Sequence, residues 1–331
     1  MMHRILRLAG ALALLATVAP RTASARHEVG PALTTPTSTL QAALTCNGDL
    51  AHARRDPVLL VHGTFANSDI NWSWNYKLAL PARGEPTCTV DLPNASAGDI
   101  QVSTEYVVYA VRAMSRASHR KVAIMGHSQG GLEARWALRW WPDIRTHVSD
   151  VIMLATPNHG SAFPDAVCTG PGVCAASLYQ MLTDSAFLAA SNADHETIGD
   201  IPYTAIVTTD DQVFVLPSQG TLNGNRHHVT NVAVQDLCPG HAVDHLTLAF
   251  DGPTYAIVTD ALDHKGPADL HRIDPAVCAT DTMPGVDRDD ANARVLAYQT
   301  TLAQLLGPDG PKADGEPPLA CYVTHECPHG H

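Results

Sequence analysis

The sequence lacks three features: an apolar segment long enough to cross a membrane, an excess of basic residues, and a Cys-x-x-Cys pair. Its N-terminal apolar run, residues 8–19, is shorter than the roughly 20 residues that a membrane-spanning helix needs. Lysine and arginine number 21 against 33 aspartates and glutamates, which gives a net charge of −12. An acidic chain does not favour binding to nucleic acid or to anionic membranes. We therefore expect no nucleic-acid partner and no integral membrane anchor.

The N-terminus nevertheless has the pattern of an export signal. Arg4 and Arg7 precede the apolar run, and the small residues 23–25 form a candidate cleavage site. This pattern predicts a signal peptide over residues 1–25 and a secreted, extracellular protein that begins at Arg26. A membrane anchor formed by the same apolar run is the less favoured alternative.

The cysteine content fits an exported protein. All eight cysteines follow the predicted cleavage site, and an even number in an exported chain predicts four disulfides. Eight cysteines allow 105 pairings, but sequence proximity favours Cys168–Cys174 and Cys321–Cys327. A zinc site is less favoured because no Cys-x-x-Cys pair is present. We expect no metal and no organic cofactor.

Short apolar runs alternate with helix-like segments along the chain. The predicted strands are residues 57–61, 87–90, 121–125, 151–155, 203–208 and 231–235. Helical spacing of apolar residues is found at 104–118 and 129–141. This alternation predicts an α/β fold with a mostly parallel sheet and helices on both faces. The predicted domains are a lead-in segment at 26–45, a main domain at 46–308 with a lid-like insertion at 163–192, and a linker with a cysteine-containing tail at 309–331.

The most informative motif is Gly126-His127-Ser128-Gln129-Gly130. It lies between a predicted strand and a predicted helix, which is the context in which a G-x-S-x-G motif forms a sharp elbow. The glycines let the backbone bend steeply and lift the serine above the carboxyl end of the sheet. We therefore predict Ser128 to be a nucleophile. A glycine-rich turn with a capping serine is the alternative.

A serine nucleophile needs a base within hydrogen-bond reach, and the base needs an acid to orient it. In doubly wound hydrolases the acid follows the serine along the chain, and the histidine follows the acid. Asp210 is the predicted acid because it comes soonest after the strand 203–208, and Asp211 is the alternative. His245 is the predicted base because its loop follows the last predicted strand.

An oxyanion intermediate would need backbone donors beside the serine. One predicted donor is the amide of Gln129, at the positive end of the elbow helix. The second is Thr64, in the loop after the strand 57–61, where Gly63 permits a tight turn. An ordinary polar turn between a strand and a helix is the alternative for this loop.

Taken together, these motifs resemble the family of secreted lipases represented by Candida antarctica lipase B and its bacterial relatives. The segments that carry the resemblance are residues 44–46, 63–64, 102–106, 128–132, 135–136, 140–145, 209–211 and 243–245. The resemblance implies an α/β-hydrolase fold. It also implies a catalytic triad and an oxyanion hole, formed by Ser128, Asp210 and His245 and by Thr64 and Gln129, respectively.

The same resemblance implies two disulfides, Cys46–Cys88 and Cys238–Cys278. The segments least similar to the family are 163–192 and the helix near 290–306, which are the candidate walls of an acyl pocket. The resemblance therefore supports the fold and the catalytic chemistry more directly than it supports a preference for acyl groups of a given length.

The function implied is that of a secreted, monomeric serine carboxylester hydrolase, lipase-like, which acts on ester or lipid substrates through an acyl-enzyme. A polyester depolymerase or an acyltransferase with the same triad is one alternative. A non-catalytic binding protein on the same scaffold is the other.

Overall fold

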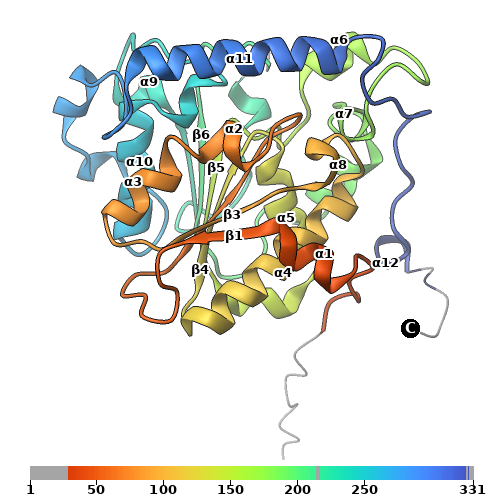
Figure 1. Cartoon of the computed structure of the whole chain (residues 1–331), viewed down its shortest axis with the longest axis horizontal. Helices are drawn as coiled ribbons and strands as arrows, with labels where there is room; N and C mark the ends of the chain where they lie inside the picture. Colours follow the sequence, from red (N-terminus) through yellow and green to blue (C-terminus); the bar gives the residue numbers. More distant parts are fainter. Residues whose placement is uncertain (1–28, 214–216, 326, 328–331) are drawn as a thin grey trace, which may run out of the picture.

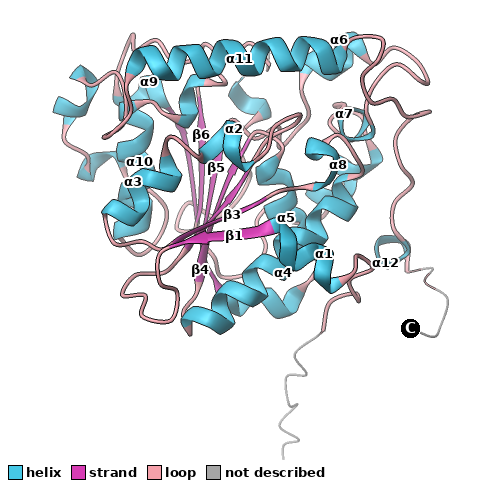
Figure 2. Cartoon of the chain, viewed as in Figure 1, coloured by secondary structure: helices cyan, strands magenta, loops and turns pink. Residues whose placement is uncertain are grey.

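The computed structural model describes residues 29–213, 217–325 and 327, and it is built around a seven-stranded sheet (Figures 1 and 2). The strand order is β1-β3-β2-β4-β5-β6-β7. The strands are β1 (Leu44–Asn47), β2 (Val58–Val61), β3 (Thr87–Val90), β4 (Val122–His127), β5 (Val148–Leu154), β6 (Tyr203–Val207) and β7 (Val229–Ala233). Strand β1 pairs antiparallel with β3, and all other neighbours are parallel. The predicted mostly parallel α/β fold is therefore confirmed.

Helices cover both faces of this sheet (Figure 2). One face packs against α1 (Thr37–Ala43), α4 (Ile100–Ser118), α5 (Gly130–Trp140), α7 (Ala176–Gln180) and α8 (Ala186–Asn192). The other packs against α2 (Ser68–Trp72), α3 (Tyr76–Ala82) and α10 (Gly252–Asp263). The remaining α-helices are α6 (Ala162–Val167), α9 (Val234–Leu237), α11 (Arg288–Leu306) and α12 (Cys321–Thr324). Short 3₁₀ helices are found at Pro93–Ser96, Pro142–His147, Pro217–Gln219, Thr247–Ala249, Leu270–Arg272 and Pro275–Ala279.

The central strands are buried on both faces, which is why apolar residues dominate most of their sequences. Every residue of β2, β3, β4 and β6 is buried. Each fully buried valine or leucine contributes about 1.5–3 kcal/mol relative to leaving it in water. Burial on both faces therefore fixes these strands at the centre of the sheet.

Several element boundaries differ from the sequence prediction, and two of the differences have a clear local reason. Helix α4 begins at Ile100 rather than at residue 104, because the side chain of Asp99 caps it by accepting from the N–H of Gln101. Strand β7 ends at Ala233, because the chain turns there into α9, whose start is capped by the side chain of Asp236 accepting from the N–H of Ala233. Strand β1 was not predicted.

All four predicted disulfides are present. They join Cys46 to Cys88, Cys168 to Cys174, Cys238 to Cys278 and Cys321 to Cys327. The first links the paired strands β1 and β3, and the third ties the loop before His245 to the segment after α10.

Both ends of the described chain are attached to the helical face formed by α4 and α5. The N–H groups of Thr34 and Thr35 donate to the carboxylate of Glu105 on α4. Near the C-terminus, the hydroxyl of Tyr322 accepts from the indole of Trp136 on α5, at 2.9 Å. The predicted signal peptide, residues 1–25, lies outside the described residues. Within the described ranges, no helix combines the length and apolarity that a membrane span requires.

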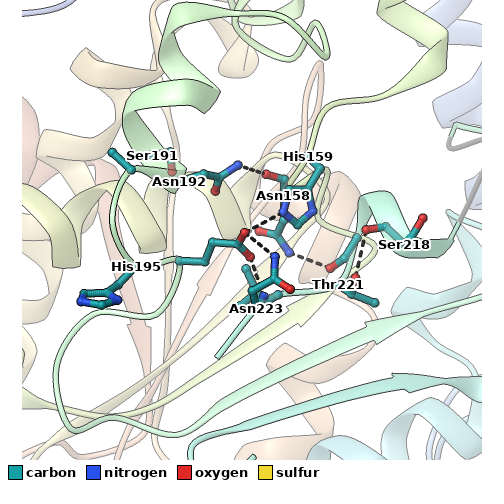
Figure 3. A network of polar contacts seen from close by, with 12 residues as sticks. Asn158, His159, Ser191, Asn192, His195, Ser218, Thr221 and Asn223 are labelled. Atoms are coloured by element: carbon teal, nitrogen blue, oxygen red, sulfur yellow. Dashed lines mark hydrogen bonds and ion pairs between the residues drawn. The ribbon is translucent and has the colours of Figure 1, made fainter. Parts of the chain in front are cut away.

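A polar network holds together three loops (Figure 3). The carboxylate of Glu196, which follows α8, accepts from the Nε2 of His159 at 2.9 Å and from the main chain and side chain of Asn223. Asn158 donates to the carbonyl of Gly220 at 2.7 Å and accepts from Asn192 through its own carbonyl. The network thus ties the loop after β5 to the segments before β6 and β7.

The ionisation of Glu196 is coupled to this network. Burial opposes the charged form, but hydrogen bonds from His159 and Asn223 outweigh burial and lower the pKa of Glu196 from 4.5 to about 2. Because this pKa is depressed on folding, its contribution to stability is present above about pH 4.5 and is lost as the pH falls towards 2.

We predict that Glu196→Gln lowers the free energy of unfolding by about 2 kcal/mol at pH 7, as loss of charged hydrogen bonds does. The difference from the wild type should shrink at pH 3, because the carboxyl group is then mainly protonated in the unfolded wild type and must lose this proton on folding. Urea unfolding at both pH values measures this difference. Asp200→Asn is the control, since the side chain of Asp200 is 94% exposed. An equal deficit at pH 7 and pH 3 would contradict the proposed ionic role.

Candidate active site

The predicted elbow forms at Ser128, between β4 and α5. Ser128 has a φ of 53°, in the left-handed region that non-glycine residues adopt at a cost. Close packing of the backbone enforces this turn. A Cβ on Gly126 would lie 2.4 Å from the carbonyl carbon of Gly130, and a Cβ on Gly130 would lie 2.3 Å from the carbonyl oxygen of Val61. The motif therefore requires glycine at both positions, and the turn leaves Ser128 partly exposed.

His245 is paired with a carboxylate in the same region. Its Nδ1 lies 2.9 Å from Oδ2 of Asp211, and both side chains are almost completely buried. The other oxygen of Asp211 accepts from the N–H of Val213 at 2.8 Å. His245 and Ser128 line one cavity. The structure therefore brings together a serine at an elbow, a histidine and a buried carboxylate.

The prediction of Asp210 as the carboxylate partner is corrected to its alternative, Asp211. Strand β6 ends at Val207, and the chain then turns, with the N–H of Asp210 donating to the hydroxyl of Thr208 at 3.1 Å. This turn leaves Asp210 exposed and directs the next residue towards His245.

The residues predicted as oxyanion donors also meet at this site. The hydroxyl of Thr64 donates to Oε1 of Gln129 at 2.6 Å. A Cβ on Gly63 would lie only 3.0 Å from the Cβ of Ser128, so the loop after β2 passes directly against the elbow. From α11, the hydroxyl of Tyr298 donates to the carbonyl of Thr64 and so attaches this loop to the late helix.

Two further residues support the site and were not predicted. Nε2 of His127 donates to the carbonyl of His245 at 2.9 Å, and the two rings lie 5.3 Å apart. Burial, together with the nearby His245, lowers the pKa of His127 to about 4, so the ring is neutral at pH 7. Asn71 accepts from the N–H of Gly63 at 3.0 Å and lies 3.2 Å from Nδ1 of His127. The only sequence signal for this support is the histidine within the elbow motif itself.

A second histidine–aspartate pair in the same loop region has a structural role at the start of α10. Nε2 of His241 pairs with Oδ1 of Asp251. The other oxygen of Asp251 caps α10 by accepting from the N–H and hydroxyl of Thr254. His241 is not among the residues lining the cavity at Ser128.

The cavity at Ser128 has a volume of about 70 Å³ and mainly apolar walls. Phe163, Leu178 and Met181 come from the predicted insertion, and Leu302 comes from α11. A second cavity of about 160 Å³ is lined by three of the same residues, Phe65, Phe163 and Leu178. The two apolar cavities therefore share one wall.

No group of three or more histidine, cysteine or acidic side chains is placed to hold a metal ion within residues 29–213, 217–325 and 327. Most of the histidine-containing end of the tail lies outside these residues.

The family model of the α/β-hydrolase fold matches residues 56–172. Together with the sheet order and the serine elbow, this match shows that the chain has the α/β-hydrolase fold. Over almost its whole length it is a homologue of lipase B: lipase B of Pseudozyma antarctica is 28% identical over 342 residues, which span 97% of this chain and 95% of that relative.

Two other comparisons agree with this relationship. The crystal structure of Aspergillus fumigatus lipase B superposes with a TM-score of 0.80 at 27% identity, covering 89% of this chain and 73% of that chain. A triacylglycerol lipase of Burkholderia plantarii is 30% identical over 126 residues, which are 36% of this chain and 34% of that protein. The chain is thus lipase-like in fold and sequence.

Proposed function

We propose that this protein is an exported serine carboxylester hydrolase that acts on ester or lipid substrates through an acyl-enzyme. Ser128 is the nucleophile, His245 the general base and Asp211 the acid that orients it. The observation that carries this proposal is the buried Asp211–His245 pair beside a cavity that also contains the elbow serine. Similarity to lipases supports the choice of esters over other acyl compounds.

The proposed reaction uses these groups in two stages. The hydroxyl of Ser128 attacks the ester carbonyl carbon and passes its proton to Nε2 of His245, while Asp211 holds Nδ1 and stabilises the imidazolium. The main-chain N–H groups of Thr64 and Gln129 donate to the developing oxyanion. His245 then protonates the departing alcohol. Water attacks the acyl-enzyme with His245 again as the base, and Ser128 regains its proton.

Export is proposed on two grounds. The N-terminal pattern of residues 1–25 is typical of a signal peptide. The four disulfides are typical of proteins that mature in an oxidising compartment.

We predict that Ser128→Ala reduces the turnover of p-nitrophenyl butyrate by about 10⁵-fold or more, because removal of a nucleophile abolishes covalent catalysis. A fluorophosphonate probe should label the wild type once, at Ser128, and leave the variant unlabelled. Circular dichroism checks that the variant is folded. An unlabelled, inactive wild type would favour a non-catalytic binding protein instead.

We predict that Asp211→Asn lowers kcat by about 10³–10⁴-fold, since an asparagine no longer stabilises the histidine in its working tautomer and charge state. Asp210→Asn is the matched control and should keep at least half of the wild-type kcat, because Asp210 is exposed. Steady-state kinetics of both variants compares the two neighbours. The reverse pattern would restore Asp210 as the acid.

We predict that the specificity constant rises with acyl length beyond acetate, because the cavity walls are apolar. Each buried methylene contributes about 0.8 kcal/mol, so two added methylenes raise kcat/KM about tenfold until the space is filled. p-Nitrophenyl esters from acetate to palmitate measure this profile. A steady decline from acetate upward would indicate a short-chain esterase.

The wall shared by the two cavities gives this profile a further test. Phe65→Gly should extend the preference to longer chains by joining the cavities, and glycine accepts the φ of 57° found at this position. An unchanged profile would show that acyl chains do not pass this wall.

A further inference from the structure

A series of hydrogen-bonded polar side chains extends from the proposed oxyanion hole into α5. The hydroxyl of Thr64 donates to Oε1 of Gln129 at 2.6 Å, and Nε2 of Gln129 donates to Oε1 of Glu133 at 2.8 Å. Gln129 and Glu133 are both 0% exposed. Glu133 lies one helical turn after Gln129, so its carboxyl group reaches back along the same face of the helix.

This series joins the two residues whose main-chain N–H groups form the proposed oxyanion hole. In the described part of the protein, neither the N–H of Thr64 nor that of Gln129 donates to a protein acceptor. Both donors are therefore available to a ligand. The bond between the two side chains fixes the loop after β2 relative to the start of α5, and Glu133 fixes the carboxamide that makes this bond.

The fold alone gives no reason for a carboxyl group at position 133. A buried carboxyl group costs free energy unless its polar atoms are paired, and Oε2 of Glu133 has no hydrogen-bond partner among the described residues. Burial raises the pKa of Glu133 to about 8, although the bond from Gln129 favours the charged form, so the group is mainly neutral at pH 7. An apolar side chain would satisfy the core at lower cost.

We propose that Glu133 is a positioning residue for the oxyanion hole. It acts through the carboxamide of Gln129 to hold Thr64 in place. The inference rests on the proposed ester hydrolysis. Glu133 does not touch the reacting atoms. Its effect is to keep the two main-chain donors at a fixed separation while charge develops on the substrate oxygen, where small displacements are costly.

The test compares Glu133→Leu with Glu133→Gln. The leucine removes the acceptor for Gln129, so kcat for p-nitrophenyl butyrate should fall about 10–100-fold, as a misplaced catalytic group allows, while KM changes less than about twofold. The melting temperature should stay the same or rise, because an incompletely paired buried carboxyl group is lost. The glutamine keeps an oxygen acceptor, so its kcat should stay within about threefold of the wild-type value.

A purely structural role for Glu133 gives a different result. It would lower the melting temperature and the active fraction of the leucine variant together, and the kcat per active site, counted with the fluorophosphonate, would be unchanged. Asp150→Leu is the control for loss of a poorly solvated carboxyl group, since burial raises the pKa of Asp150 to about 7. Asp150 lies in β5 and does not line the cavity at Ser128. The kcat of this control should equal that of the wild type.

A double-mutant cycle with Thr64→Val tests the route of the effect. If Glu133 acts through Thr64, Glu133→Leu should cause little further loss once the hydroxyl is absent. Independent, multiplying losses would overturn the proposed route. Normal kcat in Glu133→Leu would refute this inference alone, whereas a wild type without Ser128-dependent turnover would refute the proposed function and this inference with it.

Discussion

The close approach of the start of α5 to the sheet is the constraint on which the rest of the site depends. A Cβ on Gly130 would lie 2.3 Å from the carbonyl oxygen of Val61, and one on Gly131 would lie 2.0 Å from the hydroxyl of Thr156. Any side chain at either position would push the helix away from β2 or from the loop after β5. Because both positions are glycine, the start of α5 lies close enough for the elbow serine to contact the loop after β2. Backbone packing, more than any single side-chain contact, thus places Thr64 and the cavity walls beside Ser128.

The sequence predicted those parts of the fold that have a local signal. Most strands buried on both faces are short, mainly apolar runs, and the predicted bounds of β2, β3 and β6 lie within one residue of the observed ones. The elbow was predictable because its glycines have a backbone function that can be read from their spacing. Strand β1 had no such signal, since it has four residues and none of them is buried. It is held instead by pairing with β3 and by the disulfide Cys46–Cys88.

The choice between two adjacent aspartates could not be made from the sequence. It depends on how the chain turns after β6, and Thr208 controls that turn. The hydroxyl of Thr208 donates to the carbonyl of Val243 at 2.6 Å and accepts from the N–H of Asp210. The contact with Val243 joins residues 35 positions apart. The role of His127 likewise depends on a contact with a distant loop, that of His245, and no local pattern encodes such pairings.

The buried polar groups around the elbow have a cost that the rest of the structure must offset. His127, Gln129 and Glu133 are buried where an ordinary core would have apolar side chains. The loops that complete the site are held by other means: the disulfide Cys238–Cys278 restrains the loop before His245, and the network at Glu196 restrains the loop that supplies Pro157 and Ser161 to the cavity. Stabilising bonds are thus placed on the loops, while the elbow contains a serine with a positive φ and the incompletely paired carboxyl group of Glu133. This division lets the elbow keep a strained serine and a poorly paired carboxyl group without loosening the groups that must meet there.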